Sequence, residues 1–397
     1  MASLAITDVT VIDCSGAAAR PESTVLIADG RITEVGPSAN VEIPAGARVA
    51  AGRGRFLIPG LWDMHGHLTD ATEDALALLL MNGVTGVRDL GGDLALLDRW
   101  RAEIETGSRA GPRIVRAGPF VDGPKEGVTN RLTVTSPDGA RRAVHEVKAS
   151  GVDFIKVHNA LPREAFFALM AEARSENVPV AVHLPAGVSS AEASDAGAAS
   201  LEHIETINES AIWQPAATVT TVEDAVEANL GQAGQALFEL LARNGTWYVP
   251  TLIAYERGFV LWSDDPEALR PRLDIHRKQI GLVGMMHRAG VPIMAGSDFS
   301  DWGMVPGVDL HNELALLVEA GLSPLEALQT ATLNPAKFLG LSHSIGLIQD
   351  GYAADLVLLD ANPLENISHT RKINAVVSKG TFHPLASTMA KALLDAS

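Results

Sequence analysis

The residues best suited to chemistry are histidines that follow short apolar segments. His65 and His67 close the run Leu57–His67, with a single glycine between them. Successive side chains of a strand point to opposite faces, so in a strand both imidazoles would face the same side. Two imidazoles on one face can hold a metal ion, although an ordinary loop also accounts for a His-Gly-His sequence. Partners elsewhere in the chain decide between these two interpretations.

Further residues of the same kind lie in or just after later apolar segments. They are Lys156, His183, His203 and Asp298. If these segments are strands of one barrel, the side chains meet at its carboxyl-terminal face, where the active sites of such barrels lie. Mixed nitrogen and oxygen ligands with an open coordination position are typical of catalytic zinc. The set therefore predicts a metal centre in which Asp298 is both a ligand and a carrier of protons.

Lys156 has two interpretations. A lysine inside a barrel is costly unless it is paired or neutral, and Glu202 or Asp298 could pair with it. Alternatively, its amine adds CO₂ and becomes a carbamate that bridges two divalent ions. One ion would then be held by His65, His67 and Asp298, and the other by His183 and His203. Two ions sharing a hydroxide provide a nucleophile at neutral pH, with Asp298 and Lys156 as catalytic residues.

The segments that carry these residues alternate between apolar strands and helices. Between residues 58 and 344 many of the helical segments end in Gly or Asn, as helix C-termini do. This pattern predicts an α/β fold, a (β/α)₈ TIM-type barrel, with a doubly wound sheet as second choice. Segment 324–339 is expected to be one of its last helices. The expected strands are 61–65, 84–89, 113–117, 154–158, 180–183, 200–204, 247–250 and 293–297.

The two ends of the chain have β-type sequence instead. Residues 1–57 contain β-branched runs and the hairpin turn signal Asp29-Gly30, and residues 345–397 contain further short apolar runs. Neither end is large enough to fold alone. We therefore expect both ends to form one small composite β-sandwich domain beside a barrel of residues 58–344. A terminal helix is expected over Ser387–Leu394.

The composition excludes several classes of partner. The 397 residues carry a net charge of −17, which repels nucleic acid and anionic membranes. No apolar run approaches the roughly 20 residues of a membrane span. The N-terminus has no basic start of a signal peptide, and the single Cys14 excludes an internal disulfide framework. We expect a cytoplasmic protein with a small-molecule substrate and no nucleic-acid or membrane partner.

The sequence resembles the amidohydrolase superfamily over about residues 26–380. The overall pattern is similar to the imidazolonepropionase-related branch. Lys156 separates it from imidazolonepropionase and the purine and cytosine deaminases, which use one metal and lack this lysine. Branch members that carry the lysine are Xaa-Pro dipeptidases and carboxypeptidases, with ochratoxin-hydrolysing amidases nearby. The resemblance rests on the blocks Ile58–His67, Gly83–Asp89, Leu201–His203, Ala295–Asp298 and Ala354–Asp360.

The resemblance implies a (β/α)₈ barrel with a composite β-sandwich and a binuclear metal-dependent hydrolase. It implies two divalent ions, with zinc favoured, a carboxylated Lys156, and attack by a metal-bridging hydroxide. The implied substrate is an amide near a free carboxylate, as in an Xaa-Pro dipeptide or an N-acyl amino acid. The same metal site serves esters, lactones, cyclic amides and organophosphorus esters, which are the alternative. A metal-free scaffold is the least favoured hypothesis, and homo-oligomers, common among relatives, stay open.

Residues that contact the substrate are harder to place. His158 follows Lys156 by two and is expected to face the same cavity. Arg88, at the end of the second strand, could bind a carboxylate or form an ion pair with Asp89 or Asp63. The step Leu184-Pro185 departs from the small polar residues that the family usually has after its strand-five histidine.

Two long connections, residues 205–235 and 251–273, exceed ordinary loop lengths and are expected to cover the site. Tyr255 and Arg257 are the specificity residues predicted there, and Trp213 and Trp262 lie in the same connections. His311, after the last strand, is expected to have a structural role.

Overall fold

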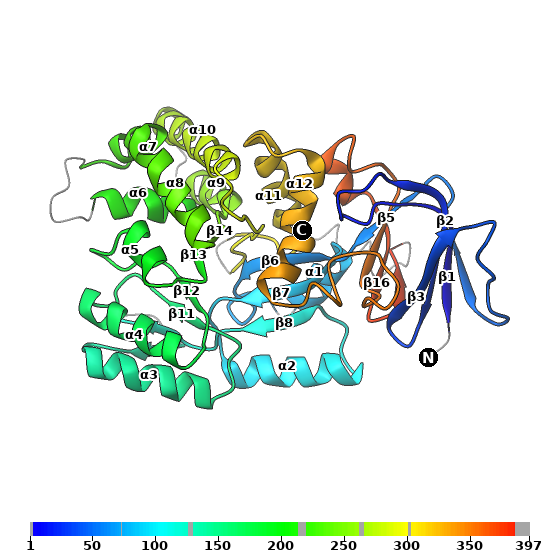
Figure 1. The fold of residues 1–397 in the computed structure, drawn as a ribbon, viewed down its shortest axis with the longest axis horizontal. Coiled ribbons are helices and arrows are strands. Elements are labelled where there is room, and N and C mark those ends of the chain that lie inside the picture. Colours follow the sequence, from blue (N-terminus) through cyan, green and yellow to red (C-terminus); the bar gives the residue numbers. More distant parts are fainter. Residues whose placement is uncertain are drawn as a thin grey trace.

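Parallel strands form the centre of the molecule, and helices surround them (Figure 1). The computed structural model describes residues 3–72, 74–125, 130–212, 220–261, 266–300 and 303–385. The strands of this central part are β6 (Leu61–Gly66), β7 (Val84–Asp89), β8 (Arg113–Arg116), β9 (Phe120–Asp122), β10 (Arg131–Thr133), β11 (Ile155–Val157), β12 (Val180–Val182), β13 (Ser200–Glu202) and β14 (Trp247–Val249).

The strands close into a barrel. One sheet has the order β6-β7-β8 and another the order β10-β9-β11-β12-β13-β14. At one seam Asp153 N donates to Arg116 O over 3.0 Å. At the other, residues 293–299 supply the eighth strand: Met294 N donates to Tyr248 O and Met64 N donates to Ala295 O, each over 2.9 Å. The predicted (β/α)₈ barrel is therefore confirmed.

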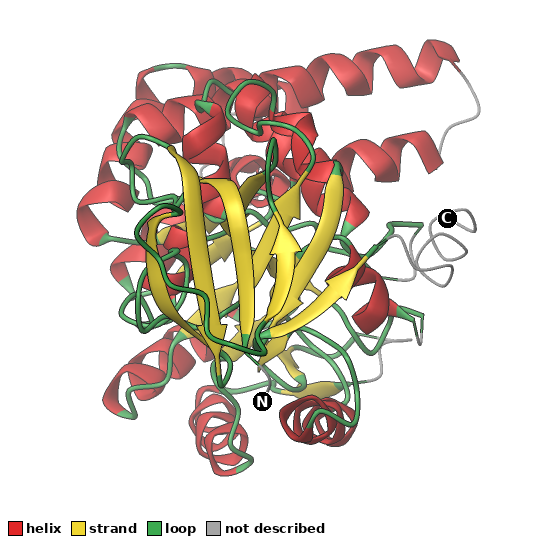
Figure 2. Cartoon of the chain, turned by 90° about the vertical axis from the view of Figure 1, so that its right-hand side faces the viewer, coloured by secondary structure: helices red, strands yellow, loops and turns green. Residues whose placement is uncertain are grey.

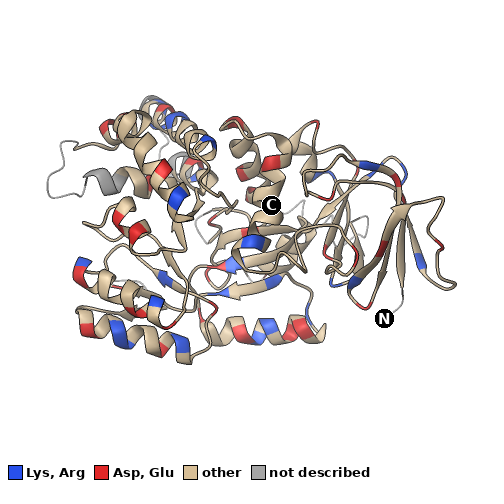
Figure 3. Ribbon diagram, in the orientation of Figure 1, with Lys and Arg blue, Asp and Glu red and all other residues tan. Residues whose placement is uncertain are grey.

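Helices follow most strands of the barrel. They are α1 (Ala75–Met81), α2 (Leu94–Thr106), α3 (Pro137–Ala149), α4 (Arg163–Ser175), α5 (Ser190–Asp195), α6 (Ile204–Ile212), α7 (Val222–Leu230), α8 (Gln232–Asn244), α9 (Leu252–Leu261), α10 (Pro266–Arg288), α11 (Val308–Glu319), α12 (Pro324–Thr330) and α13 (Leu333–Phe338). Residues of both charge signs are spread along α2, α3 and α4 on the outside of the barrel (Figure 3). No helix of the described ranges is long and apolar enough to cross a membrane.

The two long connections after the sixth and seventh predicted strands are largely helical. The prediction that they are long loops was therefore wrong. Residues 205–235 contain most of α6, all of α7 and the start of α8, and residues 251–273 contain α9 and the start of α10. The side chain of Thr221 caps α7 by accepting from Asp224 N, a signal that the sequence prediction overlooked. Trp213 and Trp262 lie outside the described residues.

The helix predicted over residues 324–339 is split into α12 and α13. Pro335, in the first turn of α13, disfavours a continuous helix, because it has no N–H to donate to the carbonyl of Ala331 and its ring would crowd that carbonyl. The carbonyl of Ala331 instead accepts from Trp62 N in β6 over 2.7 Å. The break thus ties the last helices to the first strand of the barrel.

A mixed sheet built from both ends of the chain lies beside the barrel, at the right of Figure 1 and facing the viewer in Figure 2. Its order is β17-β16-β15-β5-β1-β2-β3, and β4 pairs with β1. The members are β1 (Leu4–Val11), β2 (Arg20–Ala28), β3 (Arg31–Pro37), β4 (Arg48–Ala51), β5 (Phe56–Pro59), β15 (Leu356–Leu359), β16 (Ile373–Ser378) and β17 (Thr381–Pro384), and the short helix η1 (Ile367–Arg371) lies between β15 and β16.

The predicted composite domain takes the form of one curled sheet. β5 pairs antiparallel with β15, which joins the two ends of the chain. The start of β3 returns to the segment before β15, where Ile32 N donates to Tyr352 O over 2.8 Å. Side chains of both ends, among them Ile6 and Leu356, fill the space between the curled faces. Asp29-Gly30 forms the predicted turn between β2 and β3, and Ser387–Leu394 lies outside the described residues.

Candidate metal centre

His65, His67 and Asp298 meet at the carboxyl-terminal end of the barrel. The Nε2 atoms of His65 and His67 lie 3.3 and 3.2 Å from the same oxygen of Asp298, Oδ1. One ligand atom from each residue lies within 4.8 Å of the others. Both histidines belong to the β6 strand end, and Asp298 ends the eighth strand. The spacing read from the sequence therefore brings these three side chains to one point.

Gly66 allows the two strands to approach this closely. A Cβ atom at this position would lie 2.2 Å from Cε1 of Phe299, a distance that no pair of carbon atoms tolerates without movement. With glycine there, Asp298 N donates to His65 O over 2.7 Å and His67 N donates to Phe299 O over 2.9 Å. The backbone thus holds Asp298 against both histidines.

His203 and His183 extend the cluster on the other side of His65. The ring of His203 lies 4.4 Å from that of His65 and 4.9 Å from that of His183, centre to centre. His203 Nδ1 shares a hydrogen bond with Thr251 Oγ1 over 3.0 Å, and it lies 3.7 Å from Asp298 Oδ2. The four histidines therefore form one continuous group of rings.

Lys156 lies in the same interior on β11 and is 1% exposed. Its Nζ has no hydrogen-bond partner among the described residues, so neither Glu202 nor Asp298 accepts from it. Burial lowers the pKa of Lys156 to about 8, against the opposing pull of the Glu202 and Asp298 carboxylates. The amine is therefore much more often neutral near pH 8 than an exposed lysine is.

The donor set fits a metal ion. Three buried nitrogens of this cluster have no hydrogen-bond partner among the described residues: His65 Nε2, Lys156 Nζ and His183 Nδ1. Buried polar atoms without partners are rare in folded proteins, and each requires an explanation. Burial also lowers the pKa of His65, His183 and His203 well below the usual range, which favours the neutral imidazole that ligates metals.

The backbone is strained at this end of the barrel. His203, Thr251 and Asp298 have φ angles of 68°, 47° and 57°, in the left-handed region that residues with a Cβ rarely adopt. Such strain concentrates at functional sites, where the surrounding structure holds it.

Arg88 does not bind a substrate carboxylate as the sequence suggested. Its side chain is fully buried below the histidines. The guanidinium donates from Nε to Met64 O over 2.7 Å, from Nη1 to Ser200 Oγ over 3.0 Å and from Nη2 to Glu202 Oε1 over 2.8 Å. Each of the three guanidinium nitrogens has an acceptor inside the barrel, and the charged partner of Arg88 is Glu202 rather than Asp89 or Asp63. The long side chain reaches across the barrel, which strand alternation alone does not reveal.

His158 does lie beside the cluster. Its ring stacks on that of His183 with centres 4.5 Å apart, and its side chain is 24% exposed. Its Nδ1 lies 3.1 Å from Asn159 Oδ1 and 3.4 Å from Oδ2 of the buried Asp122. The predicted role in binding substrate is compatible with this position at the rim of the metal centre.

Tyr255 and Arg257 lie on α9 and contact neighbouring helices. The ring of Tyr255 is 5.6 Å from that of His276 on α10, and Arg257 donates to Asp309 Oδ1 on α11 over 2.8 Å. Neither of these contacts reaches the histidines of the metal centre, so the role of both residues in specificity stays a prediction. His311 is buried between Thr370 and the carbonyl of Asn82, which agrees with the structural role expected for it.

The sequence did not reveal several neighbours of the centre. The ring of Phe120 lies 5.7 Å from His67 and 5.2 Å from His158. It belongs to β9, a short strand that follows an irregular continuation of β8 and was not predicted. Thr251 and Glu202 contact the histidines through polar atoms, and only their places next to predicted strand ends could have indicated this.

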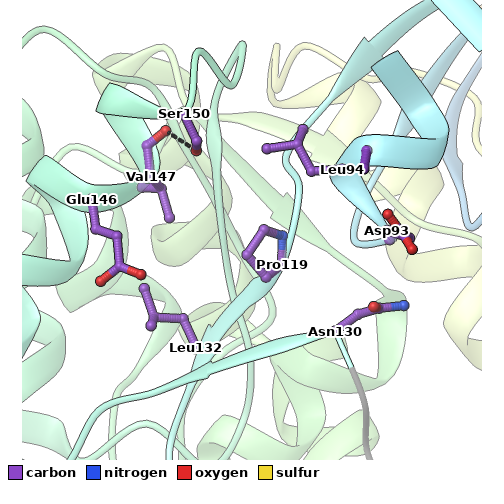
Figure 4. Close-up of a pocket in the computed structure, with 10 residues that line it drawn as sticks. Asp93, Leu94, Pro119, Asn130, Leu132, Glu146, Val147 and Ser150 are labelled. Carbon is purple, nitrogen blue, oxygen red and sulfur yellow. Dashed lines mark hydrogen bonds between the residues drawn. The ribbon is translucent and has the colours of Figure 1, made fainter. Parts of the chain in front are cut away.

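A cavity of about 420 Å³ lies outside the barrel, between α2, β10 and α3 (Figure 4). Pro119 and Leu132 line it together with Asp93 and Glu146, and Ser150 Oγ donates to Val147 O at its edge. None of the histidines, Lys156 or Asp298 is among its described lining residues. The cavity is therefore separate from the metal centre.

A barrel with histidines, a buried lysine and an aspartate at its strand ends defines a metal-dependent hydrolase. The chain belongs to the amidohydrolase family, whose sequence profile matches residues 56–382. It is thus a hydrolase of the class that acts on carbon–nitrogen bonds, as the family resemblance in the sequence implied.

Individual relatives share the whole architecture. Ochratoxinase from Aspergillus niger is 26% identical over 389 aligned positions, which cover 81% of this chain and 73% of that enzyme. A structure from Bifidobacterium longum, named as a candidate prolidase, is 27% identical with a TM-score of 0.77, covering 100% of this chain and 98% of the other. An Xaa-Pro dipeptidase with methionine bound in its active site has a TM-score of 0.76 at 22% identity, covering 96% and 100%, which shows the fold alone.

Proposed function

We propose that the protein is a binuclear metal-dependent hydrolase that cleaves the amide bond of a small substrate carrying a free carboxylate. Lys156 is the observation that carries this proposal. Lys156 is 1% exposed, and its Nζ has no hydrogen-bond partner among the described residues. It lies close enough to four histidines and an aspartate to interact with them electrostatically: His65, His67, His183, His203 and Asp298. A lone buried amine in that place is unfavourable, whereas a carbamate formed with CO₂ would bridge two ions.

Two groups of residues would hold the ions. His65, His67 and Asp298 form the first, since their ligand atoms already converge. His183 and His203 form the second, with the modified Lys156 shared between them. Bound divalent ions, with zinc as the proposed metal, supply Lewis acidity and lower the pKa of water.

Asp298 is placed to move the proton. Its Oδ1 faces the two β6 histidines and Oδ2 faces His203, and the side chain is 23% exposed. A carboxylate at the open edge of the centre can take a proton from the attacking water and pass it to the leaving amine. This is the catalytic role that we assign to Asp298.

His158 would recognise the substrate. Because its Nδ1 faces Asn159 and Asp122, its Nε2 is left to contact a group bound beside the metal centre. With hydrogen on Nδ1, Nε2 of the neutral imidazole carries a lone pair, so it can accept a hydrogen bond from the substrate, for example from the ammonium group of a dipeptide. The names of the relatives, ochratoxinase and Xaa-Pro dipeptidase among them, support an amide of an amino acid as the substrate class.

Replacing the lysine tests the proposal. Lys156→Ala should reduce amide hydrolysis by a factor of about 10³ and lower the metal content, and added short carboxylic acids should restore part of the activity by taking the place of the carbamate. Lys148→Ala is the matched control, because Lys148 lies on the surface and pairs with Glu176. A Lys156→Ala protein with wild-type activity would contradict the proposal.

A substrate screen tests the bond that is cleaved. Metal-loaded protein should hydrolyse members of Xaa-Pro dipeptide and N-acyl amino acid libraries in preference to lactones and aryl phosphates. The corresponding amides with a blocked carboxylate are the control, and their kcat/KM should be lower. Preference for a lactone or an aryl phosphate would be consistent with the metal site but would contradict the assignment of an amide as the substrate.

A further inference from the structure

Glu202 lies beneath the metal centre and contacts it through one histidine. It is the last residue of β13 and is fully buried. Its Oε2 lies 2.8 Å from His65 Nδ1, and its Oε1 accepts from Ser200 Oγ over 2.5 Å and from Arg88 Nη2 over 2.8 Å. A buried carboxylate with this many partners is held in one position.

The partners of Glu202 determine which nitrogen of His65 carries hydrogen. Both oxygens of Glu202 accept from Arg88 Nη2, and Oε1 also accepts from Ser200 Oγ, so the carboxylate is an acceptor toward its neighbours. His65 Nδ1 must therefore be the donor in the 2.8 Å contact. In a neutral imidazole the other nitrogen, Nε2, then has a free lone pair. That atom is buried without a hydrogen-bond partner and faces Asp298 Oδ1 at 3.3 Å.

Arg88 holds both the backbone and the carboxylate at this point. Its Nε donates to Met64 O, one residue before His65, while Nη2 donates to Glu202. Arg88 lies on β7, and its side chain links the strands that carry His65 and Glu202. Because all of these groups are fully buried, water cannot replace any of the bonds.

The other histidines have weaker partners. His67 Nδ1 faces the carbonyl of Gly91 at 3.2 Å, and His203 Nδ1 faces the hydroxyl of Thr251 at 3.0 Å, with Asp298 Oδ2 farther away at 3.7 Å. A hydroxyl can donate or accept, so it does not dictate the tautomer of His203. Among these three histidines, His65 alone has a ring nitrogen hydrogen-bonded to a carboxylate other than Asp298.

We propose that Glu202 is a positioning residue that fixes the Nδ1–H tautomer and the orientation of His65, with Arg88 holding Glu202 in place. The proposal rests on the proposed metal-binding function of His65. Groups that hold a ligating imidazole in this way typically change metal affinity 10- to 100-fold when they are removed. Neither Glu202 nor Arg88 touches the substrate in this account.

Glu202→Gln is a sharp test because it keeps the shape and reverses the hydrogen bond. The amide oxygen of the introduced side chain would face the Arg88 donors, so its NH₂ group would face His65 Nδ1. That arrangement favours hydrogen on Nε2, the atom needed for the metal. We expect the affinity for Zn²⁺, measured by competition with a chelator, to fall about 10- to 100-fold. Asp355→Asn is the matched control. Asp355 forms an ion pair with Arg113 at 2.8 Å, and this pair lies away from the metal centre.

NMR spectroscopy of metal-free protein labelled with [¹⁵N]histidine reads the tautomer directly. The signals that disappear in His65→Gln identify His65. They should report hydrogen on Nδ1 in the wild type and on Nε2 in Glu202→Gln. A purely structural role for Glu202 would leave this tautomer unchanged, and that result would overturn the proposal.

A paired variant keeps the test valid if Glu202→Gln does not fold. Glu202→Leu combined with Arg88→Met removes both charges at similar volume, so no unpaired charge stays buried. We expect a folded protein with the same loss of Zn²⁺ affinity. If the wild type binds Zn²⁺ and the paired variant binds it equally well, the role of Glu202 is refuted. If the wild type binds no Zn²⁺, the proposed function itself fails.

Discussion

The base of the metal centre and its rim are built in different ways. At the base, Asp63, Arg88 and Glu202 are fully buried and every one of them is hydrogen-bonded. At the rim, the side chain of His158 is 24% exposed. Removing a buried, bonded group leaves its partners unsatisfied, whereas water can replace a group at the rim. The base therefore determines the chemistry, and the rim is free to determine the substrate.

The largest effect is expected where base and rim meet, at Asp298. Asp298→Asn keeps the shape of the side chain but removes the negative charge and the ability to carry a proton. We expect kcat for amide hydrolysis to fall by a factor of about 10² to 10⁴, with reduced metal content. The assay is steady-state kinetics with metal-saturated protein. Activity within about tenfold of the wild type would show that another group moves the proton.

Gly66→Ala tests the base through its backbone. The new Cβ would lie 2.2 Å from Phe299 Cε1, so the ring must shift and the neighbouring Asp298 with it. A displacement of about 1 Å at a reacting group can cost about 100-fold in rate, and we expect a fall in kcat of that order.

Gly281→Ala is the control for the glycine prediction. A Cβ at Gly281 meets no atom within 4 Å, and alanine favours the α10 helix by about 1 kcal/mol. Its kcat should be unchanged and its melting temperature slightly higher. An equal loss of kcat in Gly66→Ala and Gly281→Ala would contradict the claim that Gly66 is needed for the close approach of the two strands.

At the rim, His158→Ala should act on substrate binding. The residue stacks on His183 but lies outside the converging atoms of His65, His67 and Asp298. Loss of a hydrogen bond to a charged group costs about 1.5–3 kcal/mol, so KM should rise about 10- to 100-fold. Metal content should stay at the wild-type value. Loss of a metal ion in His158→Ala would instead show that His158 helps to hold the metal.

Glu313 behind the rim should affect stability rather than rate. It is buried on α11, where its Oε2 accepts from Ile253 N at the start of α9. Burial raises its pKa from 4.5 to about 8. Between these values the folded protein keeps a proton that the unfolded chain has released, so stability falls as pH rises. The slope is about 1.4 kcal/mol per pH unit for one proton.

Glu313→Gln removes the group that binds this proton, so its contribution to the pH dependence of stability is lost. We expect its free energy of unfolding to exceed that of the wild type at pH 8, and the difference to shrink toward pH 4.5. Denaturant unfolding at several pH values measures this. Burial also raises the pKa of Asp63 to about 7. Asp63 therefore contributes to the decrease of stability with pH in both proteins. Identical slopes in the two proteins would show that Glu313 is not buried as a protonated acid.

The sequence predicted the converging residues of the candidate metal centre far better than their buried supports or the connections between the strands. Hydrophobic alternation located the strands, and the strand ends then placed His65, His67 and Asp298, because barrel topology leaves little freedom there. Arg88 was misassigned because its partner, Glu202, lies more than a hundred residues away and depends on the reach of a long side chain. The segments after β13 and β14 were taken as loops, although they form helices that pack on one another.

The central claim is that two metal ions at these residues catalyse amide hydrolysis. Metal-free protein titrated with Zn²⁺ under CO₂-containing buffer tests it most directly, with hydrolysis of an Xaa-Pro dipeptide or an N-acyl amino acid as the readout. We predict no activity without metal and a rise that saturates at two equivalents per chain. Full activity in the metal-free protein, or saturation at one equivalent, would contradict the account.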